Sequence, residues 1–157
     1  MKSLGQLARR VLRRVIPNFV LYKRRKRMIS ASIARVDKEL AGKSVSEVFS
    51  EIYRRHLWGK PTIDRQFSSG HGSTMDLHVA PYVAAVGKLV KELNWKPSVV
   101  DLGCGDFNVG SRTRAHFGNY VACDVAIEVL EENRVRFAGL GVDFCQVDIV
   151  CDDLPEG

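Results

Sequence analysis

The chain has 157 residues, of which 45% are hydrophobic and 27% are charged, and its formal net charge is +6. This length is enough for one domain with a core of its own, and the composition is ordinary for a soluble globular protein. The four cysteines form no Cys-x-x-Cys pair, so the sequence predicts reduced thiols, with no metal site and no disulfide framework.

The positive charge is concentrated in a basic arm, residues 1–40. From Lys2 to Arg27 there are many lysines and arginines and no acid. Up to Pro17 the apolar residues recur at helical spacing, with arginines on the other side. The arm is therefore predicted to begin with a basic amphipathic helix that ends at the proline.

Three interpretations of residues 1–27 stay open: binding to an anionic membrane surface, packing on the chain's own domain, and an organellar transit peptide. Nucleic acid is disfavoured as a partner, because few aromatic residues accompany the charges. No apolar run is long enough to span a bilayer. We therefore expect a cytoplasmic protein, which is peripheral at the inner membrane surface if the arm binds lipid.

Residues 41–97 are predicted to form a helical leader. The apolar spacing of Val45–Leu57 indicates an amphipathic helix, which Ser44 or Ser46 can cap. The segment Ser68–Ser73 is rich in glycine and serine, but it lacks the Gly-Lys-Ser/Thr of a phosphate loop. By default it is a surface loop.

A second helix of the leader is predicted to be firm from Pro81 to about Leu93. The run Ser73-Thr-Met-Asp76 fits a capping box at its start, with aspartate as the acid. Helical spacing predicts one buried apolar stripe, made of Tyr82, Val83, Val86, Leu89, Val90 and Leu93.

Residues 98–157 contain three predicted strands separated by helices. The strands are Val99–Leu102, Tyr120–Asp124 and Val142–Asp148, and the last helix is Ala126–Ala138, which a glycine pair stops. Strands that alternate with helices indicate βαβ units and a parallel sheet. The fold class is therefore α/β, a Rossmann-like parallel sheet preceded by N-terminal helices.

Two glycines follow the first strand at once, and acids stand at the strand ends. Gly103 and Gly105 make a turn in which backbone can approach a ligand. Asp101 and Asp106 lie at the carboxyl end of the first strand, the edge of an open α/β sheet where ligands bind. For Asp106, a ligand contact and simple capping of the following helix are equally supported.

Asp101-Leu-Gly-Cys-Gly105 resembles the first motif of class I S-adenosylmethionine-dependent methyltransferases, usually written Asp/Glu-x-Gly-x-Gly-x-Gly. Phe107 stands where the third glycine would be. The resemblance covers Ser98 to Pro155 and implies that the cofactor is S-adenosyl-L-methionine. The residues that it assigns to the cofactor are Asp101, Gly103, Cys104, Gly105, Asp124, Val125, Asp148 and Ile149.

The resemblance also implies a role for each acid. Asp101 holds the methionyl ammonium, Asp124 binds both ribose hydroxyls, and Asp148 with the Ile149 backbone lies beside the adenine. No catalytic residue is assigned, and His71 is the one histidine worth testing. The methyl acceptor is unknown, although a glycan-related compound or a small molecule is expected.

The leader carries a second, shorter resemblance. Phe49-x-x-Ile-Tyr53, then Trp58-Gly59, then Ser-Gly-x-Gly-Ser is similar to the leader of a bacterial methyltransferase subgroup, some of whose members stand among glycan-biosynthesis enzymes. In that subgroup the leader folds over the cofactor pocket.

The family's sheet has seven strands, and three are recognisable here. We therefore expect a chain truncated after the third strand, with an apolar edge at Val99, Val100 and Leu102 that invites self-association. One alternative function is a non-catalytic cofactor-binding fragment with a membrane-surface arm. Another is a nicotinamide-binding Rossmann protein, whose fingerprint needs glycine where Asn108 stands.

Overall fold

The structure is a computed structural model that describes residues 38–156. Residues 43–156 belong to one compact unit of the chain, separate from residues 1–42. Residues 1–27 of the basic arm lie outside the described residues, so the helix and the membrane binding predicted for them stay predictions.

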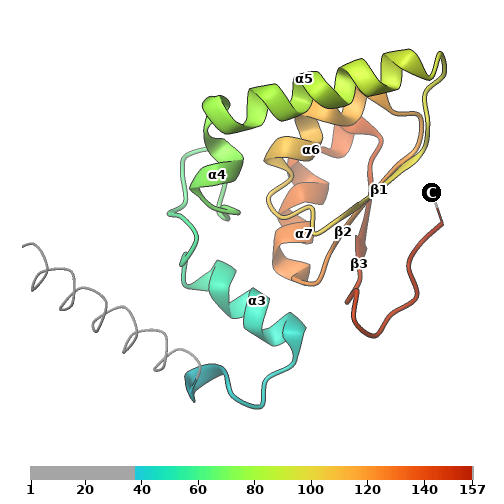
Figure 1. Cartoon of the computed structure of the whole chain (residues 1–157). Helices are drawn as coiled ribbons and strands as arrows, with labels where there is room; N and C mark the ends of the chain where they lie inside the picture. The colour runs from blue at the N-terminus through green and yellow to red at the C-terminus, as the bar shows by residue number, and fades with distance from the viewer. Residues whose placement is uncertain (1–37, 157) are drawn as a thin grey trace, which may run out of the picture. The chain divides into compact units, whose positions relative to one another are not determined.

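Three short strands form one parallel sheet in the order β1-β2-β3 (Figure 1). They are β1 (Val99–Leu102), β2 (Tyr120–Asp124) and β3 (Asp143–Gln146). Val99 pairs with Tyr120 across β1 and β2, and Cys123 pairs with Cys145 across β2 and β3. The strand ends therefore lie along one edge, and the predicted Rossmann-like α/β fold is confirmed.

Figure 1 shows α5, α6 and α7 on one side of the three strands. The connections between neighbouring parallel strands pass through α6 and α7, as βαβ units require. The helices are α3 (Val45–Arg54), α4 (His71–Thr74), α5 (Asp76–Glu92), α6 (Asn108–Thr113) and α7 (Ile127–Arg136), with 3₁₀ turns at Arg114–His116 and Ala138–Leu140.

The core between sheet and helices is built around Phe107. Its ring is fully buried and meets the rings of Tyr120, Phe137 and Phe144 edge-on, at centroid distances of 5.4, 5.2 and 5.1 Å. Edge-to-face pairs of this kind add to the apolar area that the rings bury. The residue that replaces the third glycine of the motif is thus a central packing residue of the domain.

The start of α3 agrees with the sequence. Ser44 is the N-cap and forms a capping box with Glu47, which satisfies two backbone N–H groups that the helix leaves free. Ser46, the other candidate, donates its hydroxyl hydrogen to the Val125 carbonyl at 2.9 Å. It therefore ties α3 to the end of β2.

The predicted capping box at Ser73–Asp76 is wrong. Ser73 lies inside the short helix α4, and its hydroxyl donates to the Gly70 carbonyl at 2.8 Å. The N-cap of α5 is Met75, which makes no side-chain cap hydrogen bond, and the helix begins five residues before Pro81. A serine already in a helical turn cannot adopt the extended backbone that an N-cap needs.

The predicted buried stripe of α5 is only partly buried. Val90 is 8% exposed, whereas Tyr82, Leu89 and Leu93 are 57%, 61% and 42% exposed.

Within the described residues, β1 pairs only with β2 and is an edge strand. The expected self-association through this edge stays a prediction.

Of the helices within residues 38–156, none has the length and apolar character needed to cross a membrane.

Candidate ligand-binding site

The turn after β1 is folded tightly against β2. Gly103 and Gly105 have φ angles of +77° and +54°, in the left-handed region that glycine tolerates best. The N–H groups of Gly103 and Cys104 both donate to the Cys123 carbonyl at 2.8 Å. Phe107 has a φ of +52° and so takes a glycine-like backbone conformation at the position of the missing third glycine.

Asp124 is the carboxylate that the fold places against this turn. It is 7% exposed and accepts hydrogen bonds from the Gly105 N–H at 2.9 Å and the Ala126 N–H at 3.0 Å. Burial raises its pKa, and those backbone hydrogen bonds oppose the shift. Because an ionised carboxylate has about four acceptor sites, Asp124 keeps some for a ligand.

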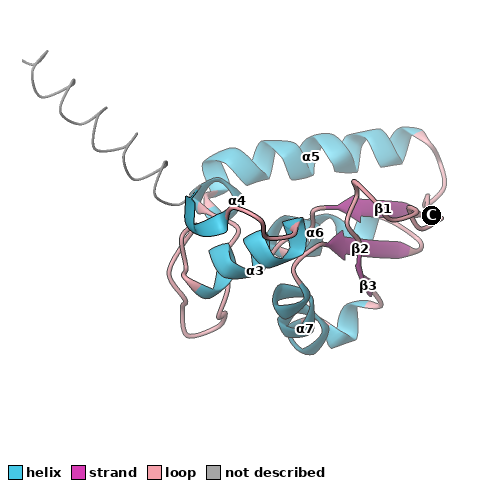
Figure 2. Cartoon of the chain, turned by 90° about the horizontal axis from the view of Figure 1, so that it is seen from below, coloured by secondary structure: helices cyan, strands magenta, loops and turns pink. Residues whose placement is uncertain are grey.

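A cavity of about 480 Å³, which we call the aromatic cavity, lies over the ends of β2 and β3. Figure 2 shows α3 beside the ends of the strand arrows, and α3 and the segment after it supply the aromatic wall. The cavity is lined by Val45, Phe49, Tyr53, Trp58, Ser69, Leu102, Gly103, Gly105, Asp124, Val125, Val147, Asp148, Ile149 and Val150.

The aromatic wall is internally packed. The Trp58 ring meets the rings of Phe49 and Tyr53 edge-on, at centroid distances of 5.6 and 5.3 Å. Burial raises the pKa of the Tyr53 hydroxyl, and the charge of Asp124 raises it further. Tyr53 is therefore a neutral phenol that can donate a hydrogen bond at neutral pH.

A second cavity of about 370 Å³, which we call the hydroxyl cavity, lies between α5 and β1. Asp101 lines it and accepts a hydrogen bond from the Tyr120 hydroxyl at 2.9 Å. Burial raises the pKa of Asp101. The other lining residues are Ser69, Ser73, Tyr82, Val86, Val99, Val100, Leu102, Gly103, Cys104, Asp106, Val109, Gly110, Thr113, Phe117 and Tyr120.

The predicted site residues divide between the two cavities. Those that line the aromatic cavity are Gly103, Gly105, Asp124, Val125, Asp148 and Ile149. Asp101 and Cys104 line the hydroxyl cavity instead. Gly103, Leu102 and Ser69 line both, so the cavities adjoin at the glycine turn.

Asp148 and Cys104, the other two predicted residues with polar side chains, also interact within the chain, Cys104 Sγ with the Gly105 carbonyl at 3.7 Å. The Asp148 carboxylate accepts from the Val150 N–H at 3.0 Å, and the Asp148 N–H donates to Asp152 at 2.8 Å. Burial raises the pKa of the Cys104 thiol, which therefore stays protonated and is a weak nucleophile. Asp148 lines the aromatic cavity and Cys104 lines the hydroxyl cavity, so both are placed to contact a ligand.

His71 lies in α4, is exposed, and lines neither cavity. Across residues 38–156 no group of three His, Cys, Asp or Glu side chains is placed to hold a metal ion. The site therefore offers carboxylates, hydroxyls, aromatic rings and glycine backbone to a ligand. Arg65 and Glu132 hold the loop before α4, and no sequence motif around either residue indicates this role.

No family model matches this chain, and no curated protein matches it. Solved structures with similar parts include CalS10, an amino pentose methyltransferase from Micromonospora echinaspora with bound S-adenosylmethionine. It is 21% identical, with 47% of this chain and 31% of that chain covered and a TM-score of 0.40.

An S-adenosylmethionine-dependent methyltransferase from Clostridium acetobutylicum is 21% identical, with 71% and 40% of the two chains covered and a TM-score of 0.44. The [4+2]-cyclase SpnF is 20% identical, with 71% and 44% covered and a TM-score of 0.43. This chain spans less than half the length of each of these proteins. At such scores the function of this chain must be argued from its own residues.

Proposed function

We propose that this chain binds S-adenosyl-L-methionine across both cavities, as the cofactor-binding part of a methyltransferase. The observation that carries the proposal is the position of Gly103, which lines both an aromatic and a hydroxyl-rich cavity. A ligand with an aromatic base at one end and an amino-acid tail at the other suits that arrangement. Its middle lies over Gly103, which has no side chain and beside which the space is open.

The nucleoside end belongs in the aromatic cavity. The free acceptor sites of Asp124 suit two neighbouring ribose hydroxyls, which both donate hydrogen bonds. Phe49, Tyr53 and Trp58 give apolar area for the base, and Asp148 and Ile149 line the same cavity.

The amino-acid tail belongs in the hydroxyl cavity. Asp101 offers a negative charge to the ammonium group, and the hydroxyls of Ser69 and Ser73 can donate to the tail carboxylate. Among the described residues that line the two cavities there is no lysine or arginine. The cavities therefore favour a cationic sulfonium and ammonium over the two phosphates of a dinucleotide.

S-adenosyl-L-methionine, when bound, supplies an activated methyl group that passes from its sulfur to a nucleophile. The contribution of these residues is to bind and orient it and to exclude water from one side. The acceptor proposed here is a glycan-related compound or a small molecule. A cytoplasmic location, peripheral at a membrane if the basic arm binds lipid, belongs to the same proposal.

Isothermal titration calorimetry tests the binding step. S-adenosylhomocysteine, the stable product form, and NADH are titrated separately into the full chain. We expect heat of binding with S-adenosylhomocysteine and none with NADH. Binding of NADH alone would replace the proposal by the nicotinamide alternative.

A further inference from the structure

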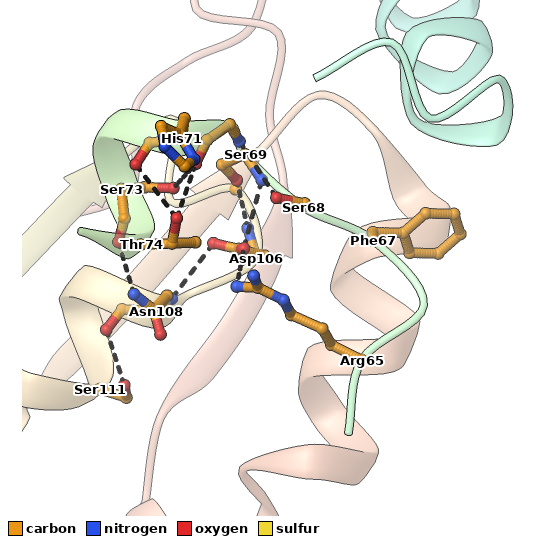
Figure 3. A network of polar contacts seen from close by, with 12 residues as sticks. Arg65, Phe67, Ser68, Ser69, His71, Ser73, Thr74, Asp106, Asn108 and Ser111 are labelled. Atoms are coloured by element: carbon orange, nitrogen blue, oxygen red, sulfur yellow. Dashed lines mark hydrogen bonds and ion pairs between the residues drawn. The ribbon is translucent and has the colours of Figure 1, made fainter. Parts of the chain in front are cut away.

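The loop of residues 65–69 is held against the glycine turn by one buried carboxylate. Asp106, which is 2% exposed, accepts hydrogen bonds from Arg65 Nη1 and from the Ser69 N–H, both at 3.2 Å (Figure 3). In return, the Asp106 N–H donates to Ser69 Oγ at 2.7 Å. The other carboxylate oxygen accepts from the Asn108 N–H at 3.3 Å. Both oxygens of Asp106 are thus engaged within the chain.

Further contacts fix the same loop. The Glu132 carboxylate of α7 accepts from the Gln66 N–H and from the Phe67 N–H, the latter at 3.1 Å. A Cβ placed on Gly105 would lie 2.0 Å from Ser69 Oγ, so only glycine lets the loop come this close. The loop is therefore docked on the turn and on α7 at once.

Ser69 stands where the two cavities adjoin. It lines both of them, and its Oγ lies 3.3 Å from the Tyr53 hydroxyl. Tyr53 in turn belongs to the aromatic wall with Trp58. The position of one serine thus sets the boundary between the cavities and the direction of the tyrosine hydroxyl.

We propose that Asp106 is a positioning residue, which with Arg65 forms a latch that fixes Ser69 and Tyr53 as the shared wall of the two cavities. The Arg65 side chain is 17% exposed, so a change at either partner leaves a largely buried charge without its counter-ion. The choice of ligand rests on the proposed function, whereas the latch itself does not. Asp106 also lines the hydroxyl cavity, so direct ligand contact is the competing role.

The variants Asp106→Asn, Arg65→Gln and their double combination separate these roles. The control is Asp76→Asn, which breaks the exposed Arg112–Asp76 pair at 2.7 Å. Amide hydrogen exchange of peptides covering residues 66–72 is followed by mass spectrometry without ligand. Both single variants are expected to raise exchange in this segment roughly tenfold, as local opening without global unfolding does, while β2 keeps its wild-type rate.

The affinity for S-adenosylhomocysteine gives the second readout. Both single variants should weaken binding roughly tenfold, and the double variant should bind no more weakly than the weaker single variant, because both residues act by holding the same loop. The emission of Trp58, read in a Trp95→Phe background, should shift to longer wavelength in all three variants. The control should match the wild type in every measurement.

Unchanged exchange at residues 66–72, or a rise shared equally by β2, would overturn the latch. Weaker binding in Asp106→Asn alone would assign Asp106 to direct ligand contact and would also overturn it. If the wild type binds no S-adenosylhomocysteine, the proposed function fails, and the exchange rates still decide on the latch.

Discussion

The aromatic cavity and the hydroxyl cavity adjoin at the glycine turn and are lined by chemically different residues. The aromatic cavity takes its wall from α3 and its carboxylates from the ends of β2 and β3. The hydroxyl cavity takes its wall from α5 and β1, and of its two carboxylates Asp101 accepts a hydrogen bond from a tyrosine hydroxyl while Asp106 accepts one from Arg65. The difference indicates that a ligand with two chemically distinct ends fits the site better than a uniform one.

The largest effect is expected at Asp124, in the aromatic cavity. Asp124→Ala should weaken binding of S-adenosylhomocysteine by about 1.5–3 kcal/mol, because a hydrogen-bond acceptor with a full charge is lost. The matched control is Asp143→Ala, since Asp143 is exposed at the opposite end of β3. Calorimetry measures both, and weakening by less than a few tenths of a kcal/mol would remove Asp124 from the site.

The pH dependence sharpens the same comparison. Burial raises the pKa of the Asp124 carboxyl above the ordinary aspartate pKa of about 3.9. In the free protein this carboxyl therefore stays protonated to a higher pH than an exposed aspartate does. A ligand that donates hydrogen bonds to the ionised form lowers that pKa, so affinity should rise with pH through the raised pKa and then level off. Adenosine is the probe for calorimetry, because it does not reach Asp101.

Adenosine binding in Asp124→Ala should be flat across the same pH range. The stability of the free protein should depend on pH in the opposite direction to the affinity for adenosine. Because the folded state holds the proton more tightly than the unfolded chain, the contribution of Asp124 to the free energy of unfolding falls as pH rises through this window. An affinity that rises as pH falls would contradict the role of the ionised carboxylate.

A change in the hydroxyl cavity should affect only the tail. Asp101→Asn should weaken binding of S-adenosylhomocysteine by about 1–1.5 kcal/mol, the upper part of the range for an ordinary hydrogen bond, because asparagine loses the charge but keeps an acceptor oxygen. Adenosine affinity should be unchanged, because its contacts lie in the other cavity. Equal losses for both ligands, measured by calorimetry, would mean that the two cavities do not divide the ligand in this way.

A change in the aromatic wall should affect both ligands alike. Trp58→Leu keeps an apolar side chain but removes the ring, and it should weaken adenosine and S-adenosylhomocysteine each by about 0.5–1.5 kcal/mol. The control is Trp95→Leu, because Trp95 is 63% exposed and lines neither cavity. A loss with S-adenosylhomocysteine alone would place the ring against the tail.

The sheet could be predicted from local sequence. Tyr120–Asp124 is a short, mostly apolar segment that follows a turn, which is typical of a buried strand, and β2 has the same bounds. The glycine turn likewise follows from Gly103 and Gly105, which need no distant partner to explain their conformation. Patterns of this kind depend on neighbours in the chain, so the sequence displays them directly.

The docking of the loop before α4 on both the glycine turn and α7 could not be predicted. Asp106 and Arg65 stand 41 residues apart in the chain and meet only when the leader docks on the turn. The exposure of Leu89 likewise depends on what covers α5, which helical periodicity does not state. Long-range contacts decide both features, and no local pattern specifies them.

The central claim, that one ligand occupies both cavities across Gly103, is tested most directly by NMR. Amide resonances of isotope-labelled protein are followed while S-adenosylhomocysteine is added up to saturation. We predict that Val125 and Ile149 of the aromatic cavity and Asp101 and Thr113 of the hydroxyl cavity shift together, with one dissociation constant. Shifts confined to one cavity, or two different dissociation constants for the two groups, would contradict the claim.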